Sequence, residues 1–312
     1  MQGIELARDY FDAYGEDLLK SFPEALPHLA VGLVGSGSEC FGFDDDISQD
    51  HDFEPGFCIF LPDETIVDRK TAFQIERAYA KLPRSFMGWE RLKIQPVGGP
   101  RHGVIRIGDF LSDRIGKTTP DLSLRDWISL PEQSLAECTN GSLFFDHEGL
   151  FSAVREKLHY LPEDVRLKKL AGCLLLMGQS GQYNYARCLK HGETGAAQLA
   201  LFEFVQSTIH AVFLLNRVYL PYYKWSFKAC SALKYHSDLV PLFELLIETG
   251  NEPEQAEEKQ AIIESIASDI IDSLHEADLT EAICQDLEKH AYSVHDRITD
   301  AELRNMHILA GV

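Results

Sequence analysis

Residues 30–61 read AVGLVGSGSECFGFDDDISQDHDFEPGFCIFL. The two apolar runs in this stretch, Ala30–Val34 and Phe57–Leu61, have the length and composition of buried strands. The residues between them are rich in glycine, serine and aspartate, which predicts a loop, with a short helix after Ser38. The sequence therefore predicts two strands joined by a long polar connection.

Two features of this connection are typical of a site that binds phosphate together with a divalent ion. Gly35, Ser36, Gly37 and Ser38 follow the first strand, and a turn of this composition offers N–H groups and hydroxyls to phosphate oxygens. Asp50 and Asp52 precede the second strand with one residue between them. In an extended chain their side chains point the same way and can hold Mg²⁺. This layout is expected of an enzyme that moves a nucleotidyl group.

Other interpretations of the same residues compete with this one. The run Asp44-Asp45-Asp46 could extend the acid pair into a solvated acidic loop, although such loops rarely lead so directly into an apolar strand. His51-Asp52 could be the pair of a metal-dependent phosphohydrolase, which usually needs further His and Asp ligands on helices. Residues 115–119 (IGKTT) look like the end of a P-loop, but Leu111 stands where that motif needs glycine, so we reject it.

Composition and charge narrow the class of protein. A length of 312 residues predicts about two domains, and 45% hydrophobic with 25% charged residues is ordinary for a globular chain with a core. The formal net charge of −20 repels a phosphate backbone, so it disfavours long nucleic acid and favours a small-molecule or protein acceptor.

Localisation is inferred from what the sequence lacks. No apolar run approaches the roughly 20 residues that span a bilayer, and the N-terminus has no signal-peptide pattern. The seven cysteines are scattered without a C-x-x-C motif, which predicts reduced thiols instead of a zinc site. We therefore expect a cytoplasmic protein without a membrane segment.

The predicted elements divide the chain into an α+β part and an all-α part. Further strands are expected at Val104–Ile107 and at Leu143–Phe145, which follows the turn Asn140-Gly141. From Glu148 onward the apolar residues recur every three and four positions, as in helices. We predict a mixed sheet with flanking helices over residues 1–147 and a helical bundle domain over residues 148–312.

Two stretches of the helical part combine aromatic, amide and basic residues. They are residues 179–187 (QSGQYNYAR) and 216–225 (NRVYLPYYKW). Aromatic rings there could stack on a base or ring, and Arg187 or Lys224 could meet phosphate charge. A buried joint between helices explains the same composition, and Arg187 also suits a helix C-terminus. We take Tyr183 and Arg187 as candidate acceptor-binding residues and Lys224 as a candidate nucleotide-binding residue.

The order of Gly35-Ser36 and then Asp50 and Asp52 resembles the nucleotidyltransferase superfamily, which includes polymerase-β-like, antibiotic-modifying and protein-adenylylating enzymes. More closely, the chain is similar to an uncharacterised bacterial family, catalogued as a domain of unknown function, with a nucleotidyltransferase-like head and a helical tail. That resemblance covers most of the chain. It is carried by residues 35–57, by CTNGSLFFD (138–146), by GQYNYARC (181–188) and by LLNRVYLPYYKW (214–225).

The resemblance implies a fold, a reaction and site residues. It implies a nucleotidyltransferase-like fold and transfer of a nucleoside monophosphate from an NTP, such as ATP, to an unidentified acceptor. Asp50 and Asp52 would bind Mg²⁺, with Mn²⁺ as the alternative ion. Superfamily enzymes use a third carboxylate on a later strand. Here the outward position of the expected strand Val104–Ile107 is Arg106, and the candidate Asp109 lies just beyond it and faces the other way in a regular strand. If that carboxylate is missing, the alternative is a nucleotide-binding sensor or scaffold. The sequence does not determine which NTP is used, the acceptor or the oligomeric state.

Overall fold

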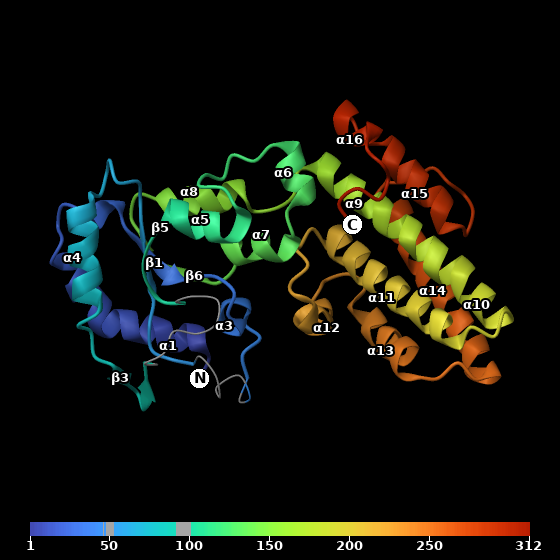
Figure 1. Ribbon diagram of the computed structural model, residues 1–312, viewed down its shortest axis with the longest axis horizontal. Coiled ribbons are helices and arrows are strands. Elements are labelled where there is room, and N and C mark those ends of the chain that lie inside the picture. Colours follow the sequence, from blue (N-terminus) through green and yellow to red (C-terminus); the bar gives the residue numbers. More distant parts are fainter. Residues whose placement is uncertain (46, 48–52, 92–100) are drawn as a thin grey trace. The chain divides into compact units, whose positions relative to one another are not determined.

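The computed structural model describes residues 1–45, 47, 53–91 and 101–312. The chain forms two compact units. The first comprises residues 1–122 and 131–159, and the second comprises residues 123–130 and 160–312. Figure 1 shows the first unit with the described strands and the second built from helices.

A four-stranded mixed sheet organises the first unit. Its strands are β1 (Ala30–Leu33), β2 (Cys58–Leu61), β5 (Gly103–Arg106) and β6 (Ser142–Asp146), in the order β5-β2-β1-β6. β1 is antiparallel to both neighbours, β2 and β6, whereas β2 and β5 are parallel. A separate ladder pairs β3 (Ser85–Phe86) with β4 (Trp89–Glu90). The four strands of the sheet lie where the sequence predicts them, to within two residues at each end.

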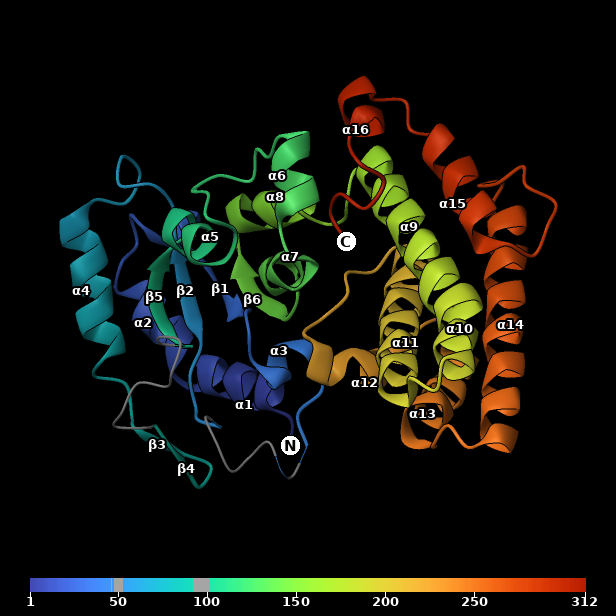
Figure 2. The same ribbon diagram turned by 45° about the vertical axis from the view of Figure 1, so that its right-hand side comes forward.

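Helices cover both faces of the sheet, as Figure 2 shows. On one face, Val31, Ile59 and Leu61 pack in a core with aromatic and aliphatic residues of the N-terminal helix and α4 (Arg69–Tyr79). The N-terminal helix consists of α1 (Gly3–Tyr10), a π-helical segment η1 (Phe11–Gly15) and α2 (Glu16–Lys20). Alternate strand residues therefore face this core, as burial of one side of a strand requires.

The opposite face is closed by α5 (Ile107–Ile115) and α8 (Leu150–Lys157). The Phe60 ring of β2 stacks on Phe151 of α8 with centroids 4.1 Å apart and meets Phe110 of α5 edge-on at 5.2 Å. This aromatic cluster is why α8 belongs to the first unit, which runs to His159, beyond the predicted boundary at residue 147. Helix α7 (Glu132–Thr139) and the short α3 (Ser38–Phe41) complete the unit.

The second unit is all-helical, and α9 (Glu163–Met177) lies at its centre. It packs against α11 (Thr194–Asn216) and α15 (Leu287–Asp296), and Figure 2 shows α11 and α14 running alongside it. The remaining helices are α6 (Leu124–Ser129), α10 (Ala186–Lys190), α12 (Ser226–Cys230), α13 (Val240–Glu248), α14 (Pro253–Glu276) and α16 (Ala301–Asn305). The predicted α+β class, with a helical part after a mixed sheet, is confirmed.

Two helices of the second unit differ from expectation. The helical pattern expected after Glu148 is interrupted by a π-helical segment, η4 (Gly178–Tyr185), between α9 and α10. Helix α11 is long and apolar enough to span a membrane by length and composition, which the sequence analysis did not anticipate. Much of α11 is buried inside the unit, where Leu201, Phe204 and Val212 are in the core.

Candidate functional site

The ends of all four strands of the sheet converge at one edge. Leu33 at the end of β1 pairs with Ser142 at the start of β6, and Gly32 pairs with Cys58 at the start of β2. Because β5 runs parallel to β2, its first residue, Gly103, lies beside Cys58. The predicted phosphate-binding turn after β1 and the segment leading into β2 therefore lie at the same edge of the sheet.

The turn after β1 is fixed in place by Asn140. The backbone N–H of Gly35 donates to Asn140 Oδ1 at 3.0 Å, and Asn140 Nδ2 donates to the Gly35 carbonyl at 2.7 Å. Arg155 Nη2 in turn donates to the carbonyls of Thr139 and Asn140, both at 2.6 Å. Gly35 has φ +138°, a conformation that side-chain-bearing residues rarely adopt, so the turn requires glycine there.

This arrangement decides which amides of the turn can bind an anion. The Gly35 N–H is already used by Asn140, contrary to the prediction that it contributes to phosphate binding. Within the described part of the chain, the N–H groups of Ser36, Gly37 and Ser38 find no acceptor. Ser36 is also exposed, so its hydroxyl and N–H are open to a ligand, whereas Gly37 is buried and has the Glu39 carboxylate against it.

The segment that leads into β2 is equally well anchored. The Tyr79 hydroxyl donates to the Phe57 carbonyl at 2.8 Å and accepts from the Phe57 N–H at 3.1 Å. Arg91 Nε donates to the Pro55 carbonyl at 3.1 Å. His102 Nδ1 lies 3.3 Å from Glu54 Oε1, which ties the start of β5 to this segment.

A cavity of about 590 Å³ opens at this edge, inside the first unit. Its volume is in the range of small-molecule binding sites. It is lined by Val34, Ser36, Cys58, Arg101, His102, Gly103, Val104, Ile105, Phe110, Asp113, Arg114 and Glu137. Ser36 is the one predicted site residue among these lining residues.

Arg114 and Glu137 form a partly buried ion pair in this cavity. Arg114 Nε lies 4.0 Å from Glu137 Oε2, and the two side chains are 20% and 22% exposed. The Arg114 guanidinium also lies 4.0 Å from the centroid of the Phe110 ring. Burial raises the pKa of the Glu137 carboxyl, and the neighbouring Arg114 lowers it in part. Burial likewise raises the pKa of the Cys58 thiol to about 12, which keeps this sulfur neutral.

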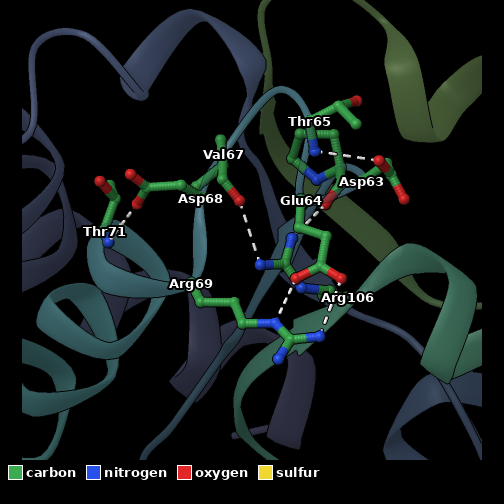
Figure 3. A network of polar contacts seen from close by, with 9 residues as sticks. Asp63, Glu64, Thr65, Val67, Asp68, Arg69, Thr71 and Arg106 are labelled. Atoms are coloured by element: carbon green, nitrogen blue, oxygen red, sulfur yellow. Dashed lines mark hydrogen bonds and ion pairs between the residues drawn. The ribbon is translucent and has the colours of Figure 1, made fainter.

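At the opposite edge of the sheet, polar contacts connect the end of β5 with the loop after β2, as Figure 3 shows. Arg106, the last residue of β5, donates from Nη1 to the Pro62 carbonyl at 2.7 Å and from Nη2 to the Val67 carbonyl at 3.0 Å. Arg69 pairs with Glu64 beside it. These contacts bind the loop after β2 to the end of β5.

Asp109 does not join the cavity, contrary to its predicted role as a third carboxylate. Because β5 is parallel to β2 and antiparallel to the direction of β1, its C-terminal end lies away from the Gly35–Ser38 turn. The chain becomes helical at Ile107, and Asp109 is exposed in the first turn of α5. One helical turn later, Asp113 does line the cavity.

The predicted metal ligands Asp50 and Asp52 lie outside the described residues. Among the residues that the structure does describe, no group of three or more His, Cys, Asp and Glu side chains could hold a metal ion.

The remaining predicted residues belong to the second unit. Tyr183 and Arg187 meet on one helical surface: Arg187 Nη1 donates to the Tyr183 hydroxyl at 3.0 Å. Tyr183 lines a cavity of about 670 Å³ together with Gln179, Gln182, Glu264 and other polar residues. Lys224 Nζ lies 4.6 Å from the centroid of the Trp225 ring, a cation–π contact.

Sequence reasoning missed the side chains that build the cavity at the sheet edge. Arg101, His102, Arg114 and Glu137 carry no motif, and they come from three segments far apart in the chain. Asn140 belongs to the predicted turn Asn140-Gly141, but that turn motif predicts a backbone conformation and not a role for the Asn140 side chain. Their common role becomes visible only once the strand directions are known.

Comparisons with known proteins give a family model that matches part of the chain and a distantly similar structure. Residues 127–226 match the family model described as "Domain of unknown function (DUF4037)", which agrees with the resemblance to such a family. A crystal structure of a nucleotidyltransferase-like protein from Exiguobacterium sibiricum is similar at 10% identity and a TM-score of 0.36. That similarity covers 93% of this chain and 89% of the other. No curated protein matches the chain.

Proposed function

We propose that this protein transfers a nucleoside monophosphate from an NTP to a hydroxyl of a small-molecule or protein acceptor. The observation that supports the proposal most strongly is the convergence at one sheet edge. The amides of Ser36–Ser38, which find no acceptor among the described residues, lie at this edge. So do the segment that follows the acid pair and a cavity of about 590 Å³. This combination suits a phosphate-bearing substrate.

In this proposal the turn binds the terminal phosphates. The N–H groups of Ser36, Gly37 and Ser38 and the Ser36 hydroxyl would donate hydrogen bonds to phosphate oxygens. Asn140 would keep the turn in its binding conformation, because it holds both polar groups of the Gly35 backbone. An acceptor oxygen would then attack the α-phosphorus, and pyrophosphate would leave.

Asp50 and Asp52 would hold Mg²⁺, or Mn²⁺ in its place. When bound, such an ion neutralises negative charge on the phosphates and orients them for in-line attack. The roles of Tyr183 and Arg187 in acceptor binding and of Lys224 in nucleotide binding stay predictions, as do the cytoplasmic location and the disfavoured long nucleic acid.

A second candidate is a nucleotide-binding sensor or scaffold without turnover. It is favoured by the position of Asp109, which leaves the described residues without a strand-borne third carboxylate at the site. Both candidates require that an NTP binds. They differ in whether an acceptor releases pyrophosphate from it.

The decisive experiment is transfer of label from α-labelled NTPs to candidate acceptors, with pyrophosphate release measured in parallel. Asp50→Asn combined with Asp52→Asn is expected to abolish transfer while the thermal unfolding curve stays unchanged. The matched control is Asp9→Asn combined with Asp12→Asn, which removes two exposed carboxylates elsewhere in the first unit.

Each result has one interpretation. Full transfer by the Asp50/Asp52 double variant would refute the proposed metal pair. Acceptor-dependent pyrophosphate release by the wild-type protein would exclude the sensor. A thermal shift with NTP and Mg²⁺, without pyrophosphate release for any acceptor, would favour the sensor over the transferase.

A further inference from the structure

Arg114 has hydrogen-bonding capacity that the described part of the protein does not use. A guanidinium carries five N–H donors. Nη1 makes a long bond of 3.4 Å to the Phe110 carbonyl, and Nε is buried without an acceptor among the described residues. The Glu137 carboxylate balances the charge from 4.0 Å, a distance too long for a hydrogen bond. The side chain therefore lacks the acceptors that a buried guanidinium normally has.

The guanidinium lies directly against the predicted phosphate-binding turn. Arg114 Nη2 is 2.7 Å from the position that a Cβ atom on Gly35 would occupy. Arg114 and Ser36 line the same cavity. An anion bound at the amides of the turn would thus lie within reach of the arginine.

The charge of the chain makes this arrangement informative. The protein carries a formal net charge of −20, which disfavours anions over most of its surface. At this cavity Arg101 and Arg114 bring two cations together, next to the carboxylates of Asp113 and Glu137. Arg114 balances the charge of the Glu137 carboxylate but forms no hydrogen bond with it. Its guanidinium can therefore bind another anion that does accept hydrogen bonds.

We propose that Arg114 is the phosphate-binding cation of this cavity and that Glu137 is the counter-ion which the guanidinium exchanges for the ligand's phosphate. The inference deepens the proposed function and rests on it for the identity of the ligand, a nucleoside triphosphate. Phosphate oxygens match the planar fork of a guanidinium and accept two parallel hydrogen bonds from it. In the structure the two groups lie 4.0 Å apart.

The inference is tested by calorimetric titration of the full-length protein with inorganic tripolyphosphate and with ATP plus Mg²⁺. Arg114→Gln is expected to weaken both affinities by about ten- to a hundredfold, the effect of losing hydrogen bonds to a charged group. The matched control is Arg69→Gln, which removes the same charge from an exposed arginine at the opposite edge of the sheet. That variant is expected to bind like the wild type.

Two further variants separate binding from folding. Arg114→Gln leaves Glu137 without its partner, which can destabilise the unit. Arg114→Gln combined with Glu137→Gln removes both charges, and it is expected to fold and still bind weakly. Glu137→Gln alone is expected to bind at least as tightly as the wild type, because the competing carboxylate is gone.

The outcomes distinguish this inference from the proposed function. Equal affinities of the Arg114→Gln and Arg69→Gln variants would overturn the inference and leave nucleotidyl transfer open. Weaker binding by Glu137→Gln, or no tripolyphosphate binding by the wild type, would also overturn it. If binding depends on Arg114 but no acceptor is ever labelled, the inference stands and the transferase proposal fails.

Discussion

Replacing Asn140 by alanine should destabilise the first unit by removing the side chain that holds the turn after β1. The change deletes two hydrogen bonds, of 3.0 Å from the Gly35 N–H and of 2.7 Å to the Gly35 carbonyl. Gly35 is buried, so both backbone groups lose their partner without full access to water. The two bonds from Arg155 should persist, because they end on backbone carbonyls that the substitution keeps.

The size of the effect follows from the cost of unpaired buried groups. Each one costs about 1–3 kcal/mol, which gives an upper range of roughly 2–6 kcal/mol for the pair. The neighbouring Ser36 is exposed, so water can reach part of the turn, and we expect a loss of about 2–4 kcal/mol in the free energy of unfolding. Asn140→Asp keeps an acceptor for the Gly35 N–H and loses the donor, so its effect should be smaller.

Urea unfolding followed by tryptophan fluorescence measures this loss for the first unit alone. The chain has three tryptophans, and Trp127 and Trp225 belong to the second unit. Replacing these two by phenylalanine leaves Trp89 as the reporter, and its ring lies 4.4 Å from that of Phe53. Gln74→Ala, at an exposed position of α4 in the same unit, is the control and should change stability by less than about 0.5 kcal/mol.

A loss below about 1 kcal/mol for Asn140→Ala would refute the reasoning, because that is no more than one ordinary net hydrogen bond. It would mean that water replaces the amide at the turn. Tripolyphosphate titration of the same variant adds a second readout: if Asn140 keeps the turn in its binding conformation, the affinity falls as well. Unchanged affinity in a destabilised variant would separate the structural role of Asn140 from ligand binding.

Two further predictions concern other joints. Arg106→Met removes the bonds to the Pro62 and Val67 carbonyls; it should cost about 2 kcal/mol in urea unfolding and leave the tripolyphosphate affinity unchanged. In the second unit, the Arg166 guanidinium lowers the pKa of the Glu163 carboxyl to about 2. Because this folded-state pKa lies below the unfolded value of about 4.3, the stabilisation is complete above pH 5 or so and disappears as the pH falls toward 2. Glu163→Gln should therefore destabilise by about 1 kcal/mol at pH 7, a figure reduced because the carboxylate is 46% exposed, and progressively less below pH 4 or so. Urea unfolding with Trp127 and Trp225 kept as reporters of the second unit measures this.

The strands were predictable because they are short apolar runs between turn residues. Ala30–Val34 and Phe57–Leu61 were expected and the observed strands lie within them, since burial on both faces selects apolar residues at every position. The order β5-β2-β1-β6 and the parallel pairing of β2 with β5 are set by contacts between distant segments. No local pattern carries that information.

The expectation that Asp109 lies at the site has the same cause, because local patterns do not give strand direction. Asp109 was expected near the site because it follows a predicted strand, but the direction of that strand was unknown. Because β5 is parallel to β2, the residues that directly follow its C-terminal end lie at the opposite edge. Arg114 was missed for the complementary reason: α5 continues beyond Asp109, and it is the later residues Asp113 and Arg114 that line the cavity.

The π-helical segment Gly178–Tyr185 could not be predicted from the local sequence pattern either. Helical periodicity detects apolar residues at three and four positions, and a π-helix within a longer helix alters that spacing only locally. Tyr183 and Arg187 were singled out from composition alone, and they do lie in contact. Composition could not indicate that the helix widens where Tyr183 lines a cavity.

The distribution of satisfied backbone groups at the sheet edge supports the proposed binding site independently of any motif. Strand ends leave N–H and C=O groups without ladder partners, and proteins normally pair them. Here side chains do so on both sides of the turn: Asn140 pairs the Gly35 backbone and Tyr79 pairs that of Phe57. The N–H groups of Ser36, Gly37 and Ser38 find no acceptor among the described residues. Beside them, Nε of Arg114 is buried and also has no acceptor there. The groups without a partner at this turn are donors, which is why the proposed ligand is an anion; phosphate would fit both the amides and the guanidinium.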